Sequence, residues 1–239
     1  MTTKHISFKS GEFTLYGVLH LPGKLPAPFI VGCHGLFADK NSLKQKELAK
    51  ACLQNGMAYL RFDHRGCGES EGDIATDTTI EARCEDLANA VEELNRYPET
   101  AGLAGLFGSS MGGAVVLAQA KKLGGIPVVT VAAPLHSEPV MAAVKLSENV
   151  NAEKLPHSFY ERALKFDISK QVTGTQNVLL IHGQNDAVVP VEHARLIYDL
   201  LKEPKDLFIM EGGDHRLNAE NHLKPFISKA VKWFVKDVL

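Results

Sequence analysis

The segment 103–114 reads LAGLFGSSMGGA and holds the strongest fold signal in the chain. It starts as a short apolar run, passes through a Gly-x-Ser-x-Gly turn centred on Ser110, and ends in small apolar residues that favour a helix. A strand, a sharp turn and a helix in this order can expose a serine hydroxyl at the edge of a sheet. The segment therefore predicts a strand–turn–helix unit with Ser110 at the turn.

Two glycines flank this serine at a distance of two residues. Side chains at Gly108 and Gly112 would collide with the neighbouring strand or helix, and glycine avoids that collision. The amide of Met111 would then lie at a helix N-terminus, where it can face a developing negative oxygen. A glycine-rich helix start that binds phosphate is the alternative. Ser109 is a rival hydroxyl, but only Ser110 has both glycines, so we interpret Ser110 as a nucleophile.

Apolar runs of similar length recur on both sides of this segment. Because they do not alternate with polar residues, they favour strands buried on both faces of a parallel sheet. Helical patterns separate them, which indicates an α/β fold with helices on both faces of a mostly parallel central sheet. Two alternating segments, 6–13 and 15–21, predict an antiparallel start. The expected buried strands are 28–33, 57–62, 103–107, 128–131, 178–181 and 207–210, and the expected helices are 42–54, 79–97, 112–123, 191–201 and 220–238.

Residues 135–174 interrupt the strand–helix alternation. They hold no strand pattern, and short helical patterns occur at 141–146 and 158–164. A connection of roughly 40 residues is longer than most and is usually functional. We predict a small helical cap inserted into a single domain that covers residues 1–239. The alternative is an elaborated crossover that does not contact substrate.

Composition excludes several function classes. The chain has 239 residues, a net charge of −2 and no basic stripe, so a nucleic-acid partner is not expected. It has no run of about 18 apolar residues and no apolar signal core, so we expect no membrane partner and a cytoplasmic location. Its cysteines form no C-x-x-C pair, which favours reduced, buried thiols and no metal site. These cysteines are Cys33, Cys52, Cys67 and Cys84.

A serine hydroxyl needs a base within hydrogen-bond reach, and that base needs an orienting acid. After such a serine turn the acid is expected first and the base second, each beyond a strand. Asp186 follows the strand at 178–181, and His215 follows the strand at 207–210. The carboxyl ends of parallel strands share one edge of a sheet, so these side chains are expected to meet there.

The other acids and histidines have simpler interpretations. Asp63 lies in a turn, where capping and pairing with Arg65 explain it, and Asp214 is adjacent to the base that it would have to orient; Glu211 is a third competitor. His34 and His182 precede glycines at strand ends and are expected to be buried rings bonded to nearby loops. His193 lies on a helix and is expected to be exposed.

A second backbone amide for a negative oxygen should come from the loop after an earlier strand. The loop 34–37 reads HGLF and follows the strand at 28–33. We choose the amide of Leu36, with that of Phe37 next. An ordinary strand-end turn is the alternative.

Taken together, these motifs resemble the α/β-hydrolase superfamily, and within it small bacterial esterases of the cinnamoyl/feruloyl kind and the serine aminopeptidase-like group. The resemblance implies a catalytic triad with two oxyanion amides, and a cap that contributes to an acyl or aromatic pocket. The implied triad is Ser110, Asp186 and His215, and the implied amides are those of Leu36 and Met111. The matching motifs are His34-Gly35-Leu36, Asp63-His64-Arg65-Gly66-x-Gly68-x-Ser70, Gly108-x-Ser110-x-Gly112, His182-Gly183-x-x-Asp186 and Gly213-Asp214-His215.

Substrate contacts are expected from Phe37, the last residue of the loop 34–37, which we call the oxyanion loop. They are also expected from Leu135, His136 and Phe159 in the insertion, although such residues also serve as ordinary packing. The expected function is hydrolysis of carboxylic esters of small acyl or aromatic acids, with a small-molecule ester as partner and no cofactor. A peptidase, a thioesterase or a carbon–carbon hydrolase would use the same residues. A binding protein without activity is the remaining alternative.

Overall fold

The computed structural model describes residues 1–138, 157–163 and 165–236, and its centre is an eight-stranded sheet. The strand order is β1-β2-β4-β3-β5-β6-β7-β8. The first two strands pair antiparallel with each other and the strands from β3 to β8 run parallel, as the sequence predicts. The antiparallel pairing of β2 with β4 joins the two parts of the sheet. The strands are β1 (Thr2–Ser10), β2 (Phe13–Leu21), β3 (Ala27–Cys33), β4 (Ala58–Phe62), β5 (Thr100–Ser109), β6 (Val128–Val131), β7 (Val178–Gly183) and β8 (Lys205–Met210).

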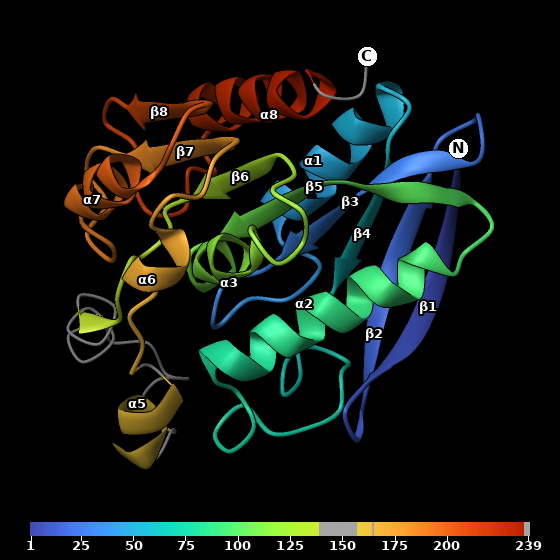
Figure 1. Ribbon diagram of the computed structural model, residues 1–239, viewed down its shortest axis with the longest axis horizontal. Coiled ribbons are helices and arrows are strands. Elements are labelled where there is room, and N and C mark those ends of the chain that lie inside the picture. Colours follow the sequence, from blue (N-terminus) through green and yellow to red (C-terminus); the bar gives the residue numbers. More distant parts are fainter. Residues whose placement is uncertain (139–156, 164, 237–239) are drawn as a thin grey trace.

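Helices cover both faces of the sheet (Figure 1). Helices α1 (Leu43–Gln54) and α8 (Glu220–Val235) lie together on one face, and α2 (Ile80–Asn95), α3 (Met111–Gln119) and α7 (Glu192–Leu200) lie on the other. Successive strand residues point to opposite faces, so Leu106 joins the core beneath α2 and α3, while its neighbour Phe107 joins the core beneath α1 and α8. This two-sided burial is the physical reason for the continuous apolar runs.

Several elements differ in their bounds from the sequence prediction; β1, for example, covers Thr2–Ser10 rather than 6–13, and β5 and α3 differ for reasons that the contacts explain. Strand β5 starts at Thr100 rather than 103 because Thr100 pairs with Ala27 at the start of β3. Helix α3 ends at Gln119 rather than 123. The chain leaves it through a turn in which the Gly125 N–H donates to the Ala120 carbonyl at 2.9 Å, and Gly125 has a φ of 67°, which glycine adopts without strain.

The ends of the segment predicted as an insertion lie side by side. Ser137 N–H donates to the Phe166 carbonyl at 3.0 Å, and Ile168 N–H donates to the Leu135 carbonyl at 3.0 Å. Helix α5 (His157–Ala163) matches the pattern predicted at 158–164, and α6 (Ser169–Val172) follows. The helix predicted at 141–146 lies outside the described residues.

Three further observations concern the described part of the chain only. None of its helices combines the length and the apolar character that a membrane span needs. No group of three or more His, Cys, Asp or Glu side chains within it is arranged to hold a metal ion. All four cysteines are free and buried.

Candidate active site

Ser110 lies at the tight turn between β5 and α3. Its backbone has φ 54° and ψ −123°, a strained conformation for a residue with a side chain. The Ser110 N–H donates to the Val131 carbonyl of β6 at 2.8 Å, which ties the turn to the sheet. A methyl group on Gly112 would overlap the backbone carbonyls of Cys33 and His34. The absence of a side chain there lets α3 begin directly against the end of β3.

Three side chains from separate loops form one hydrogen-bonded chain at this edge. The Nε2 atom of His215 lies 3.1 Å from the Ser110 Oγ, and its Nδ1 lies 2.8 Å from the Asp186 Oδ2. A carboxylate accepts only, so the His215 proton lies on Nδ1 and the Nε2 lone pair faces the serine hydroxyl. The structure thus brings together the nucleophile, base and acid candidates. The rival hydroxyl of Ser109 has no such contact among the described residues.

Asp186 is held in place from several directions. Its Oδ1 accepts from the backbone N–H groups of Val188 and Val189, at 2.9 and 2.8 Å. Its Oδ2 lies 3.3 Å from the His182 Nε2 as well as near His215. Burial acts to raise the pKa of Asp186, but the bonds from His182, His215 and Val189 hold that pKa well below its usual value. The buried side chain is therefore an ionised acceptor at neutral pH.

The loop that carries His215 packs directly on the loop that carries Asp186. A methyl group on Gly183, at the end of β7, would overlap the carbonyls of Gly213 and Asp214. The Asn185 N–H donates to the Gly213 carbonyl at 2.8 Å. This close approach of two backbones is the reason for the glycines in both motifs, and it sets the distance between the acid and the base.

The loop 34–37 lies against the nucleophile. A methyl group on Gly35 would lie 3.4 Å from the Ser110 Cβ and 3.9 Å from its Oγ. The Leu36 N–H comes from this loop, and the Met111 N–H is the first of α3, where no intrahelical acceptor exists. The predicted oxyanion amides therefore belong to the two segments that flank Ser110.

Comparisons with known proteins give the family of the chain. A family described as "Serine aminopeptidase, S33" matches residues 25–172, more than half of the chain. The chain belongs to the serine aminopeptidase S33 family of α/β hydrolases. It is 28% identical over 227 residues to "Palmitoyl-protein thioesterase ABHD10, mitochondrial" of Mus musculus, a match that covers 85% of this chain and 74% of that protein.

Solved structures show the same fold. Est1E from Butyrivibrio proteoclasticus with bound ferulic acid superposes on this S33-family chain with a TM-score of 0.80 at 17% identity, covering 98% of this chain and 99% of that one. "Alpha/beta hydrolase domain-containing protein 10 from mouse" gives a TM-score of 0.72 at 20% identity and covers 100% of both chains. The chain is thus a hydrolase with the α/β-hydrolase fold.

The candidate substrate residues of this S33-family hydrolase occupy two places. The exposed Phe37 and the fully buried Phe159 of α5 face each other with ring centroids 6.5 Å apart, beside the oxyanion loop. Leu135 is buried in the core after β6, whereas His136 is partly exposed and lines a cavity of about 1000 Å³ with Phe166 and Asp167. Contact of these residues with substrate stays a prediction.

Two sequence interpretations are wrong. His193 is buried rather than exposed, because its Nδ1 accepts from the Leu135 N–H at 3.1 Å and its ring lies 4.5 Å from that of His136. Asp63 caps its turn as predicted, because its Oδ2 accepts from the Glu69 N–H at 3.0 Å, but it pairs with Lys40 rather than with Arg65. Arg65 instead donates to Asp86 and Glu85. His34 and His182 are buried and bonded to loop carbonyls, as predicted.

Sequence reasoning missed Lys44, a buried lysine of α1. Its Nζ donates to the backbone carbonyl of Arg216 at 2.5 Å, one residue beyond His215. Burial lowers the pKa of Lys44 to about 8, although Asp214 opposes this shift. The only sequence signal is its spacing of four residues from Leu48, which places a charged residue on the buried face of the helix.

Proposed function

We propose that this S33-family protein is a serine hydrolase that cleaves carboxylic esters of small acyl or aromatic acids through an acyl-enzyme. The observation that carries the proposal is the continuous hydrogen-bonded chain from Asp186 through His215 to Ser110. A buried carboxylate, an imidazole with its lone pair on the serine side and a strained serine turn together supply the roles that nucleophilic catalysis needs.

The mechanism follows from these contacts. The Ser110 Oγ attacks the substrate carbonyl carbon while the His215 Nε2 takes the hydroxyl proton. The negative charge on the tetrahedral intermediate is stabilised by the backbone N–H groups of Leu36 and Met111. His215 then passes its proton to the leaving alcohol, and water repeats the sequence on the acyl-enzyme with the same proton transfers.

The aromatic pair Phe37–Phe159 favours acyl groups with an apolar or aromatic body. Phe37 follows Leu36 in the loop 34–37, and Gly35 of that loop lies against Ser110, which supports a role of the pair beside the acyl group. Phe159 also contacts Tyr160 edge-on, with ring centroids 5.2 Å apart. Apolar contact of this kind suits a hydrophobic acyl group better than a charged one.

The test combines covalent labelling with turnover. A fluorophosphonate probe should label the wild-type protein and the Ser109→Ala control but not Ser110→Ala, and p-nitrophenyl butyrate should be hydrolysed by the same two proteins only. Undiminished labelling of Ser110→Ala, or a wild-type protein that neither reacts with the probe nor hydrolyses the ester, would contradict the proposal.

A thioesterase is the second candidate, because one relative over most of the chain is a palmitoyl-protein thioesterase. The two activities differ only in the leaving group, so they are separated by rates on one acyl group. We expect kcat/KM for a butyryl oxygen ester to exceed that for the matched butyryl thioester and the matched amide. A clear preference for the thioester, in a protein still inactivated by Ser110→Ala, would favour the second candidate. A preference for the amide would favour a peptidase.

A further inference from the structure

The largest fully buried side chain in the described structure is that of Arg83, in the first turn of α2. Its guanidinium reaches the oxyanion loop. Nη1 lies 3.2 Å from the His34 carbonyl oxygen and 3.3 Å from that of Gly35, and Nη2 lies 3.2 Å from that of Leu36. Three successive carbonyls of the loop thus converge on one cation.

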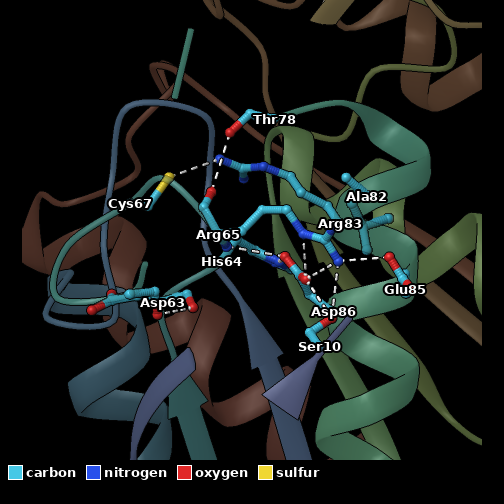
Figure 2. Close-up of polar contacts among 12 residues, drawn as sticks. Ser10, Asp63, His64, Arg65, Cys67, Thr78, Ala82, Arg83, Glu85 and Asp86 are labelled. Atoms are coloured by element: carbon cyan, nitrogen blue, oxygen red, sulfur yellow. Dashed lines mark hydrogen bonds and ion pairs between the residues drawn. The ribbon is translucent and has the colours of Figure 1, made fainter. Parts of the chain in front are cut away.

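The partners of Arg83 differ from those of the neighbouring Arg65. Figure 2 shows the guanidinium of Arg65 among Ser10, Glu85 and Asp86, whereas Arg83 reaches towards Cys67, whose sulfur lies 3.2 Å from Nη2. Within the described part of the chain, no carboxylate forms an ion pair with Arg83. A buried charge is costly unless polar groups compensate it. Here the compensation comes mainly from the carbonyl dipoles of the oxyanion loop.

Peptide geometry turns these bonds into a constraint on the amides. The Gly35 carbonyl and the Leu36 N–H belong to one planar trans peptide, so they point in opposite directions. The Gly35 oxygen also accepts from the His34 Nδ1 at 2.7 Å and from the Ala38 N–H at 3.4 Å. With its oxygen held by three donors, this peptide directs the Leu36 N–H away from Arg83. The bond to the Leu36 carbonyl constrains the Phe37 N–H in the same way.

We propose that Arg83 is a positioning residue that holds the oxyanion loop in its working conformation and polarises the Leu36 N–H. The inference rests on the proposed function, because it assigns Arg83 to the oxyanion that the mechanism forms. The loop lies against the Ser110 side chain. A rotation of the Gly35–Leu36 peptide would therefore turn the Leu36 N–H away from the tetrahedral intermediate on Ser110. A cation bound to the carbonyl end of a peptide draws electron density from its N–H and makes it a stronger donor.

The test compares two arginine variants of the full chain. Arg83→Met removes the bonds to the loop, and Arg65→Met removes a neighbouring buried arginine that donates only to Ser10, Glu85 and Asp86 side chains and to no loop carbonyl. With p-nitrophenyl butyrate, Arg83→Met should lower kcat by about 10- to 100-fold, less than the loss of a whole oxyanion donor, and leave KM within about threefold. Butylboronic acid, which forms a tetrahedral adduct on serine, should bind more weakly to Arg83→Met by a similar factor. Arg65→Met should be less stable towards urea and keep kcat within about threefold of wild type.

The outcomes separate this inference from the proposed function. An active wild-type protein with unchanged kcat and boronate affinity in folded Arg83→Met overturns the role of Arg83 alone. Equal kcat losses in both arginine variants also overturn it, because the effect would follow stability. If Arg83→Met does not fold, Arg83→Lys, which keeps the charge but not the fork of donors, is measured instead, and unchanged kcat in that variant overturns the inference. A wild-type protein without probe labelling or ester hydrolysis refutes the proposed function itself.

Discussion

Gly108 and Gly112 face each other across the turn that carries Ser110, so closely that a methyl group on Gly108 would overlap the Gly112 carbonyl. The same group would also meet the Gly113 Cα at 2.7 Å. The end of β5 and the start of α3 therefore contact each other through backbone atoms alone. The position of the Ser110 hydroxyl depends on the absence of a side chain at both Gly108 and Gly112.

Gly108→Ala is therefore expected to damage both stability and activity. Overpacking at this contact should reduce the free energy of unfolding by about 1–3 kcal/mol. The turn must also shift, so kcat for p-nitrophenyl butyrate should fall at least about tenfold, since a 1 Å displacement of a catalytic group can cost roughly 100-fold. Urea unfolding and steady-state kinetics measure the two effects.

Gly23→Ala is the matched control, because nothing lies within 4 Å of a methyl group at that position. It should leave both quantities near the wild-type values. A Gly108→Ala protein with wild-type stability and kcat would show that the turn tolerates a side chain and would refute this account of the glycines.

Asp186→Asn should abolish most activity with little loss of structure. The backbone N–H groups of Val188 and Val189 hold the Oδ1 position, so the Asn oxygen should stay there and its NH₂ group should face His215. The His215 Nδ1 would then have to accept a hydrogen bond, which moves its proton to Nε2 and leaves no lone pair for Ser110. We expect kcat to fall by about 10⁴-fold.

Asp214→Asn provides the control for this carboxylate. Asp214 neighbours His215, but its Oδ1 accepts from the Leu217 N–H at 2.7 Å, a bond that Asn preserves. This variant should retain kcat within about threefold of wild type. If Asp186→Asn turned over as fast as Asp214→Asn, Asp186 would not orient the base.

The sheet and the positions of Ser110, Asp186 and His215 could be predicted because their signals are local. Burial on both sheet faces leaves continuous apolar runs, and close backbone contacts leave glycines, as at Gly183 against Gly213. The carboxyl ends of parallel strands share an edge, so strand order along the chain was sufficient to place the acid and the base together.

Partners brought together only by the tertiary fold could not be predicted. Asp63 was assigned to Arg65, two residues away, but it pairs with Lys40, and Arg65 pairs with Asp86 of α2. The spacing of apolar residues around Arg83 does indicate that this arginine is buried. Arg83 follows Ile80 by three residues and precedes Leu87 by four, so it lies on the buried face of α2, where an arginine must have polar partners.

Lys44→Met is expected to lower activity through the loop of His215. The substitution keeps the length and apolar stem of the side chain but removes the donor to the Arg216 carbonyl. With that tie lost, His215 should spend less time in contact with Ser110, and kcat should fall by about tenfold. Lys46→Met, on the exposed side of α1, should leave kcat unchanged. Equal kcat values in the two variants would exclude a role for the Lys44 contact.

Acid should destabilise the protein through its buried histidines. Burial lowers the pKa of His64 to about 4, although its bond to Asp86 opposes the shift, and burial also lowers the pKa values of His34 and His193. Between pH 6.5 and 4 the unfolded chain binds protons that the folded protein does not, so the free energy of unfolding falls as the pH falls through this window. His64 alone should account for about 1–2 kcal/mol between pH 7 and pH 5.

Urea unfolding at pH 7 and pH 5 measures this effect, and His64→Gln isolates one histidine. A Gln amide can still donate to Asp86 but does not titrate, so the loss of stability between the two pH values should be smaller than in wild type by about 1–2 kcal/mol. His5→Gln, at an exposed position of β1, should keep the wild-type pH dependence. An unchanged pH dependence in His64→Gln would mean that this histidine is not held neutral by the fold.

Asp86 titrates in a separate, more acidic window. Burial acts to raise the pKa of Asp86, but bonds from His64 and Arg65 lower that pKa to about 2, so its stabilising contribution is lost only below about pH 4.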